Sequence, residues 1–267
     1  MLGNGLVHGM YNPATVWASD TSIYFDGVND YAKFTLSRNS DLDVLVNSIQ
    51  ISVWVRIPAI GTVDHTILLL KQASGDAYIK LWYDTSEEQL VLTRTDKNGS
   101  NPISVNHSYP AAVITGGANG AYTNICARAT TDILTITTSF AGAAVSTTSV
   151  TDGAGGEWDD TMPIMNIWLG LNEAGGNNPM LGWISNLAIW KDAEAVDAAG
   201  IADIFNLGEP KNELETQNED LFIYHTASER AFSSDGLKQT STYTIASNIA
   251  KQLVLHGAIL TGHGQTS

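Results

Sequence analysis

The sequence predicts an all-β protein, built as an antiparallel jelly-roll β-sandwich with one short helix and with arms at its two termini. Two observations carry this prediction. Short runs of β-branched and aromatic residues, broken by Gly, Asn and Asp, follow one another at roughly even spacing from residue 22 to residue 190. No amphipathic helical pattern lies between these runs, which is typical of two packed antiparallel sheets and not of a parallel α/β fold.

Each run is predicted as a strand from its own pattern. In the run 49–57, aliphatic residues alternate with Gln, Ser, Trp and Arg, so the aliphatic side is predicted to face the core. Asn98-Gly99 and Ser74-Gly75-Asp76 are predicted to form loop tips. The aliphatic residues of the run 182–190 do not share one parity, which predicts a β-bulge. The predicted strands are 22–25, 32–35, 49–57, 66–71, 78–83, 89–95, 122–129, 133–140, 144–150, 165–169 and 182–190.

The chain changes character after the last predicted strand. Asp192 is predicted to cap a helix over residues 193–206. Residues 209–220 carry five acidic side chains and few apolar ones, which favours a solvated linker. Residues 221–267 hold only two short apolar clusters, so they are predicted to dock on the sandwich or on another chain. The predicted organisation is an N-terminal arm at 1–21, a sandwich domain at 22–208, and an acidic linker with a C-terminal docking segment at 209–267.

Composition and charge exclude several classes of function. The chain has 13 basic and 28 acidic residues, a net charge of −15. This charge repels phosphate backbones and anionic lipid, so neither nucleic acid nor membrane is an expected partner. Lys33 is the first basic residue, so no charged region of a secretory signal is expected, and no run is apolar enough to span a bilayer. Cys126 is the single cysteine and is predicted to be a buried small hydrophobe.

Three stretches point to a known family. Residues 22–34 (Ser-Ile-Tyr-Phe-Asp-Gly-Val-Asn-Asp-Tyr-Ala-Lys-Phe) resemble the opening strand pair of laminin G-like domains in the concanavalin A-like superfamily. Residues 51–55 (Ile-Ser-Val-Trp-Val) are similar to the second signature strand of that family, and 182–190, with the helix after it, to the closing strand. The resemblance implies a twisted jelly-roll sandwich, a scaffold that hosts sugar binding, protein adhesion and, in some branches, glycoside cleavage. The fold alone does not select among these functions.

The acidic stretch from Glu157 to Asp160 is a candidate for two kinds of chemistry. Glycosidases of this superfamily carry alternating carboxylates on a strand, because two acids must flank the bond that is cleaved. Here glycines precede the stretch and Pro163 follows it, so a loop is predicted, no catalytic residue is assigned and the protein is predicted not to be an enzyme. Clustered carboxylates also suit calcium, although a solvated acidic loop is the favoured alternative. The calcium candidates are Asp152, Glu157, Asp159 and Asp160, and no other cofactor is expected.

Tryptophans are the candidate ligand-binding residues. An aromatic ring stacks on the apolar C–H face of a sugar, and Trp82, Trp158 and Trp183 are the candidates for this role, with packing or subunit contact as the alternative. Trp54 and Trp190 lie in signature strands and are predicted to be packed. The six histidines form no zinc motif, and neither a nucleophile elbow nor a phosphate-binding loop occurs.

Two functions of different class fit these observations. The leading hypothesis is a non-enzymatic virion structural or decoration protein of a bacteriophage, which displays the sandwich on a capsid or tail. Its terminal arms would attach it to capsid or tail proteins, and a homo-oligomer is expected. Laminin G-like domains usually work outside cells, yet this sequence shows neither the expected export signal nor a pair of cysteines for a disulfide. Release of virus particles by lysis of the host would bring such a protein outside the cell, and the hypothesis rests on this argument. The alternative is a carbohydrate-binding adhesin or lectin for host-surface glycans. A glycoside hydrolase is disfavoured by the missing carboxylate strand.

Overall fold

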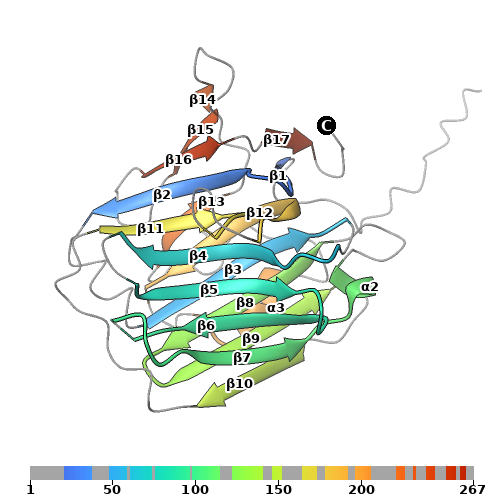
Figure 1. The fold of residues 1–267 in the computed structure, drawn as a ribbon, viewed down its shortest axis with the longest axis vertical. Coiled ribbons are helices and arrows are strands. Elements are labelled where there is room, and N and C mark those ends of the chain that lie inside the picture. The colour runs from blue at the N-terminus through green and yellow to red at the C-terminus, as the bar shows by residue number, and fades with distance from the viewer. Residues whose placement is uncertain are drawn as a thin grey trace, which may run out of the picture.

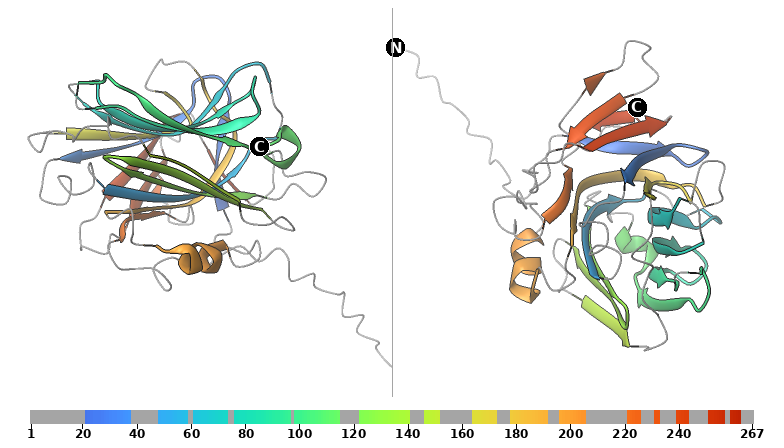
Figure 2. Two further views of the ribbon diagram at one scale, coloured as in Figure 1. Left: turned by 90° about the horizontal axis from the view of Figure 1, so that it is seen from below. Right: turned by 90° about the vertical axis from the view of Figure 1, so that its left-hand side faces the viewer.

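The computed structural model shows a sandwich of two antiparallel sheets, A and B, that lie face to face (Figure 1, Figure 2). The predicted all-β jelly-roll sandwich is therefore confirmed. The described residues are 21–37, 48–58, 61–73, 76–96, 98–114, 122–140, 146–151, 164–172, 178–191, 196–205, 221–225, 231–232, 239–243, 251–256 and 259–262.

Sheet A contains eight of the described strands. In spatial order they are β10 (Ser146–Thr151), β9 (Ile133–Phe140), β8 (Thr123–Thr130), β3 (Ser48–Arg56), β12 (Leu181–Trp190), β1 (Thr21–Asp26) and β17 (Ile259–Gly262), with β13 (Leu221–His225) also paired to β12.

Sheet B contains nine of the described strands. In spatial order they are β14 (Ala231–Phe232), β15 (Gln239–Tyr243), β16 (Lys251–His256), β2 (Tyr31–Ser37), β11 (Ile164–Leu169), β4 (His65–Gln72), β5 (Tyr78–Asp84), β6 (Gln89–Arg94) and β7 (Ile103–Ser108).

The core fills the space between the sheets, and β3 shows how the sequence builds it. Successive side chains of a strand point to opposite faces. The aliphatic side of β3, from Ile49 to Val55, is buried in the main core together with Ile57, as predicted. The opposite side of β3 is buried as well: Gln50, Ser52 and Trp54 are at most 1% exposed. The outer face of sheet A is therefore covered at β3.

A helix provides part of this cover. Helix α3 (Ala198–Phe205) lies against the outer face of sheet A, on the side away from sheet B (Figure 2). The sequence predicted a cap at Asp192, which lies outside the described residues. In the structure the helix begins later, because Asp197 caps it: the Asp197 Oδ1 accepts a hydrogen bond from the backbone N–H of Gly200 at 2.8 Å.

The structure describes a second helix where the sequence predicted only one. Helix α2 (Ala111–Ile114) has four residues and follows β7 directly after Pro110. Proline is favoured in the first turn of a helix, and the Ile114 N–H donates to the Pro110 carbonyl at 3.3 Å. So short an element leaves no periodic pattern in the sequence, which explains why it was not predicted.

The predicted irregularity in β12 is confirmed. The pairing of β12 with β3 shifts between Ser185 and Ala188. Asn186, inside this interval, adopts a φ of 46°, a left-handed conformation that asparagine tolerates better than most residues. The bulge brings Ile184, Leu187 and Ile189 into the main core despite their different parity.

The turn after β1 carries the chain from sheet A to sheet B. Gly27 has a φ of 79°, and a β-carbon there would lie 3.0 Å from the Leu181 Cβ. The Asp26 N–H donates to the Asp30 carboxylate at 3.0 Å, and the Val28 N–H donates to the Asp26 carboxylate at 2.8 Å. The stretch that resembles the opening of laminin G-like domains is thus two strands joined by a structural turn.

Strands from the C-terminal part of the chain extend both sheets. β13 pairs with β12 and β17 pairs with β1 in sheet A, whereas β16 pairs with β2 in sheet B. Residues on either side of position 208 therefore share the same sheets. The division into an arm, a sandwich domain and a docking segment stays a prediction. Residues 1–20 of the predicted N-terminal arm lie outside the described residues, and Thr21 begins β1. Among the described helices, none has the length and apolar character needed to cross a membrane.

His107 joins the two sheets through buried hydrogen bonds. It lies in β7, and its Nδ1 and Nε2 are each 2.9 Å from a hydroxyl, of Thr148 in β10 and Thr138 in β9. Burial lowers the pKa of His107 from 6.5. Burial also lowers the pKa of His65, although the Pro179 backbone and the charge of Asp64 act in the opposite direction. Both rings are therefore harder to protonate in the folded protein than in the unfolded chain.

Acid is expected to destabilise the fold through these two histidines. As the pH falls below about 6.5, the two histidines become protonated in the unfolded chain but stay neutral in the folded chain, because their folded pKa values are lower. The free energy of unfolding therefore decreases until the pH reaches these lowered pKa values. The slope is at most about 1.4 kcal/mol per pH unit for each histidine. Denaturant unfolding at pH 7.5, 6.5 and 5.5 measures the change, and His107→Gln should flatten it. A free energy of unfolding that increases as the pH is lowered from 7.5 to 5.5 would contradict this account.

Candidate functional site

Strand β5 presents a row of polar and aromatic side chains on the outer face of sheet B. Buried and half-buried residues alternate along it. Ile79, Leu81 and Tyr83 belong to the core between the sheets. The other side of the strand carries Tyr78, Lys80 and Trp82, which are half-buried, so part of each side chain reaches solvent.

A hollow of about 260 Å³ lies beside this row. The register of β4 and β5 sets its floor, because Lys71 is opposite Tyr78 and Leu69 is opposite Lys80. Three further residues that line it come from loops: Asp76, Gly99 and Asn172. We call the hollow together with Trp82 the β5 surface.

The loop after β6 is shaped to fit this hollow. The Asp96 Oδ1 accepts the backbone N–H groups of Asn98 at 2.9 Å and Ser100 at 2.8 Å, which closes the loop into a tight turn. Gly99 has a φ of 74°, and a β-carbon there would collide with the Cβ and backbone of Asp76. Glycine is therefore required at the predicted loop tip, because only glycine lets the loop approach Asp76 so closely.

Lysine side chains lie over the tryptophan rings of this face. The Lys80 Nζ is 4.8 Å from the centroid of Trp82, and the Lys33 Nζ is 4.4 Å from that of Trp168. The Tyr31 ring is 5.1 Å from the Trp168 ring, which is only 8% exposed. Trp168 is therefore a packed residue, whereas Trp82 keeps part of its ring at the surface. Burial lowers the pKa of Lys80, and the charge of Asp64 opposes this shift.

The structure separates the three tryptophans that the sequence nominated for ligand binding. Trp82 lies on the β5 surface. Trp183 is 2% exposed and packs with Trp54 and Tyr122, so the expectation that it offers a ring face to a ligand is wrong. Trp158 lies outside the described residues. Trp54 and Trp190 are fully buried and Cys126 is 2% exposed, as predicted.

The four calcium candidates, Asp152, Glu157, Asp159 and Asp160, also lie outside the described residues. Within the described ranges, no group of three or more His, Cys, Asp or Glu side chains is placed to hold a metal ion. Three residues that line the hollow were not nominated from the sequence: Asp76, Tyr78 and Asn172. The alternation of Tyr78, Lys80 and Trp82 along the sequence was a signal for Tyr78. Asp76 and Asn172 lie in loops, and only the pairing of the strands places them beside the hollow.

The β5 surface offers partners for a hydroxylated ligand. Tyr78 and Trp82 present aromatic rings, against which the C–H face of a sugar can stack. The Asp76 carboxylate accepts hydrogen bonds, the Asn172 amide both donates and accepts them, and Lys71 and Lys80 donate them.

No protein-family model matches the sequence, and no curated protein is similar to it in sequence. Solved structures share its architecture. A heptameric SAP-like pentraxin from Limulus polyphemus matches with a TM-score of 0.50 at 15% identity, over 79% of this chain and 94% of the pentraxin. This chain therefore shares the architecture of a two-sheet antiparallel sandwich with that pentraxin.

Two further solved structures share the sandwich fold with this chain. One, from Bacteroides ovatus, is provisionally assigned as a carbohydrate-binding protein; it matches with a TM-score of 0.56 at 10% identity, over 91% of this chain and 60% of that protein. The other is tailspike protein 2 of an Escherichia coli O157:H7 bacteriophage, with a TM-score of 0.50 at 11% identity, over 79% of this chain and 30% of the tailspike. This chain therefore spans less than two thirds of either protein, and at these identities the likeness concerns the fold.

Proposed function

We propose that this chain is a non-enzymatic carbohydrate-binding protein that holds a glycan on the β5 surface. The observation that carries the proposal is the half-buried row of Tyr78, Lys80 and Trp82 beside a hollow lined with hydrogen-bonding groups. The likeness in fold to the Bacteroides ovatus protein assigned to carbohydrate binding supports it.

The spacing along β5 suits an extended saccharide. Tyr78 and Trp82 are four residues apart on the same face, which corresponds to about 13 Å along a strand. One sugar ring would occupy the hollow against Tyr78, where the Asp76 carboxylate and the Asn172 amide would bind its hydroxyls. A later ring of the same chain would stack on Trp82, whose orientation the Lys80 ammonium holds.

Glycan binding to the full chain tests this proposal. A glycan array would select a ligand, and calorimetry would measure its affinity for variants. Trp82→Ala and Tyr78→Ala are each expected to weaken binding by about five- to thirtyfold, the equivalent of about 1–2 kcal/mol. Tyr24→Ala is the matched control, because Tyr24 is also half-buried but belongs to sheet A.

Two results would contradict the proposal. If no glycan on the array bound the protein, the proposal that the chain binds carbohydrate would be contradicted. A bound glycan whose affinity is unchanged in both Trp82→Ala and Tyr78→Ala would place the binding site elsewhere on the molecule.

We propose as a second function that the chain is a bacteriophage virion protein, displayed on a capsid or tail as a homo-oligomer. Its likeness in fold to a phage tailspike and the acidic charge of −15 are compatible with this role. Capsid or tail proteins would then be its partners, and host-surface glycans its ligands. Immuno-electron microscopy of purified particles with an antibody against the chain tests the proposal: labelled heads or tails are expected, and unlabelled particles would contradict it.

A further inference from the structure

Lys80 lies between the two aromatic rings of the β5 surface. Along the outward side of β5 the order is Tyr78, Lys80 and Trp82, with about 6.7 Å between successive residues of this side. Strand β5 runs between β4 and β6 (Figure 1), and the residues opposite Lys80 in these strands, Leu69 and Thr93, carry no charge. A ligand that spans the two rings therefore passes over an ammonium group.

The Lys80 ammonium can donate hydrogen bonds to such a ligand. An ammonium has three N–H donors, and among the described residues none accepts a hydrogen bond from Lys80. Its Nζ contacts the ring of Trp82, 4.8 Å from the centroid. Burial lowers the pKa of Lys80 and the charge of Asp64 opposes this shift. The Asp64 Oδ1, however, accepts the Thr85 N–H at 3.1 Å. The N–H donors of Lys80 are therefore left for oxygen atoms of a ligand.

Carboxylates lie on either side of Lys80 along the chain. Asp76 precedes β5 and lines the hollow, whereas Asp84 is the last residue of the strand, where its Oδ1 accepts the Ser86 N–H at 3.0 Å. Lys71 also lines the hollow, so its charge offsets that of Asp76. The β5 surface is therefore positive at its centre and balanced or negative at its two ends, in a chain with a net charge of −15.

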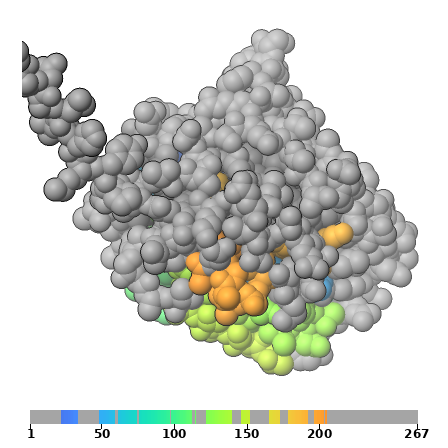
Figure 3. All heavy atoms as spheres, turned by 180° about the vertical axis from the view of Figure 1, so that it is seen from behind, coloured from blue at the N-terminus to red at the C-terminus, as the bar shows by residue number. Residues whose placement is uncertain are grey.

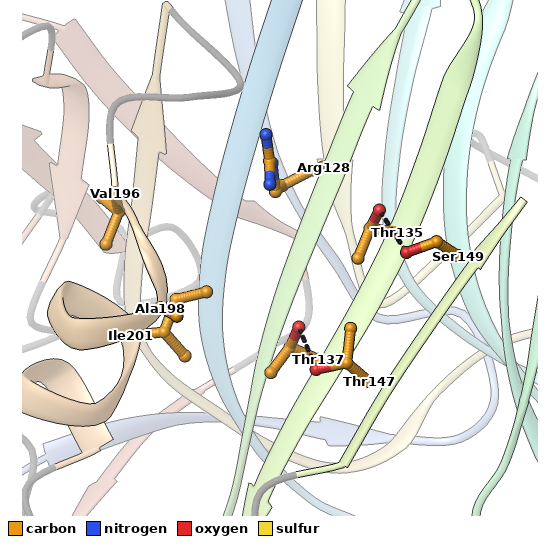
Figure 4. A pocket seen from close by; sticks show the side chains of 8 residues that line it. All are labelled: Arg128, Thr135, Thr137, Thr147, Ser149, Val196, Ala198 and Ile201. Atoms are coloured by element: carbon orange, nitrogen blue, oxygen red, sulfur yellow. Dashed lines mark hydrogen bonds between the residues drawn. The ribbon is translucent and has the colours of Figure 1, made fainter. Parts of the chain in front are cut away.

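A hollow on the other sheet differs from this arrangement. Figure 3 shows helix α3 beside the surface of the strands β8 to β10, and a hollow of about 210 Å³ lies there. Its hydroxyls bond to one another, Thr135 to Ser149 at 2.9 Å and Thr137 to Thr147 at 3.1 Å (Figure 4). Arg128 lines this hollow, but no aromatic residue is among its described lining residues. An ammonium between two aromatic rings thus distinguishes the β5 surface.

We infer that the β5 surface selects a glycan in which one acidic sugar lies between neutral sugars. The inference rests on the proposed function and names its class of ligand. The carboxylate of the acidic sugar pairs with Lys80, while one neutral ring occupies the hollow beside Tyr78 and another stacks on Trp82. Further carboxylates on the glycan are disfavoured, because Asp76 and Asp84 repel them at the two ends. Lys80 is thus a specificity-determining residue of the site.

Matched trisaccharides on a glycan array test this inference. Each set has one linkage and three forms: a neutral form, a form with a carboxylate in place of the hydroxymethyl group of the central sugar, and a form with this change in all three sugars. The full chain is expected to bind the central-carboxylate form about five- to tenfold more tightly than the neutral form, since a hydrogen bond between charged groups is roughly twice as strong as a neutral one. It should also prefer this form to the fully carboxylated one.

Variants measured by calorimetry locate the selection at Lys80. In Lys80→Gln the affinity ratio of the central-carboxylate form to the neutral form is expected to fall to about one, whereas Lys80→Arg should keep the preference. Lys33→Gln is the matched control, because the Lys33 Nζ lies 4.4 Å from the Trp168 ring centroid on the same sheet, but β11 and β4 separate its strand from β5. Arg128→Gln, in the hollow beside α3, should also leave the ratio unchanged.

Asp84→Asn tests the repulsion at the end of the strand. The variant removes the charge but keeps an oxygen that can accept the Ser86 N–H. It is expected to strengthen binding of the fully carboxylated form about two- to threefold and to leave the neutral form unaffected. An unchanged affinity for the fully carboxylated form would contradict the role given to Asp84.

Three results would overturn the inference while the proposed function stands. Equal affinity for the neutral and central-carboxylate forms would show that the site does not select an acidic sugar. A preference that persists in Lys80→Gln would place the carboxylate elsewhere. Tighter binding of the fully carboxylated form would show that the ends of the surface do not repel anions. If no trisaccharide of any set binds, the proposed function and this inference fail together.

Discussion

Trp183→Ala is expected to lower the free energy of unfolding by about 3–5 kcal/mol, the usual cost of truncating a buried tryptophan. The ring is 2% exposed and packs against Trp54 and Tyr122, and the Tyr24 ring lies 5.1 Å from it. The Arg56 guanidinium lies 4.8 Å from the ring centroid. Removal of the indole would therefore leave a cavity, and the neighbouring side chains would lose several packing contacts at once.

Chemical denaturation of the variant measures this loss, and Trp82→Ala is the comparison. Trp82 is half-buried, so its truncation should cost far less stability while it weakens glycan binding. The folded fraction of Trp183→Ala should bind glycan with unchanged affinity. A stable Trp183→Ala protein that has lost its glycan ligand would reverse the roles of these two residues.

Gln50→Ala is expected to lower the free energy of unfolding by about 2–4 kcal/mol, since each buried polar group left without a partner costs about 1–3 kcal/mol. The Gln50 side chain satisfies both the N–H and the carbonyl of Val196, at 2.9 and 3.0 Å. Its loss would release the start of α3 from sheet A. The outer face of the sheet would then be exposed where the helix now covers it.

Hydrogen exchange of the α3 amides measures this release directly, together with the denaturation midpoint. Faster exchange over residues 198–205 is expected in Gln50→Ala. Gln72→Ala is the matched control, because Gln72 is a half-buried glutamine at the end of β4. Protection of α3 that is equal in both variants would show that Gln50 does not anchor the helix.

Residue parity predicted which side of a strand faces the main core, but not what covers the other side. The aliphatic side of β3 and the irregularity in β12 were both visible in the sequence. Trp183 was nominated as a ligand-binding residue on the expectation that its side chain faces outward, with packing as the alternative. It is buried because it packs with Trp54, Tyr122 and Tyr24, which come from segments far apart in the chain.

The candidate site was predictable to a similar extent. Trp82 was nominated from the sequence as a residue that faces outward, and it lies half-buried on the β5 surface. Asp76, Gly99 and Asn172 come from three different loops, and only the pairing of β4 with β5 and the shape of the 95–101 loop bring them together. The cap of α3 was misplaced because acidic residues occur at both Asp192 and Asp197, and the sequence pattern does not show which of them starts the helix.

The central claim is that this sandwich binds carbohydrate through the outer face of sheet B. The most direct test is an NMR titration of the full chain with the glycan selected on an array, followed through backbone amide shifts. The account predicts shifts concentrated in β4 and β5 and around Asp76, Gly99 and Asn172. Shifts confined to other parts of the molecule, or a protein that binds no glycan, would contradict it.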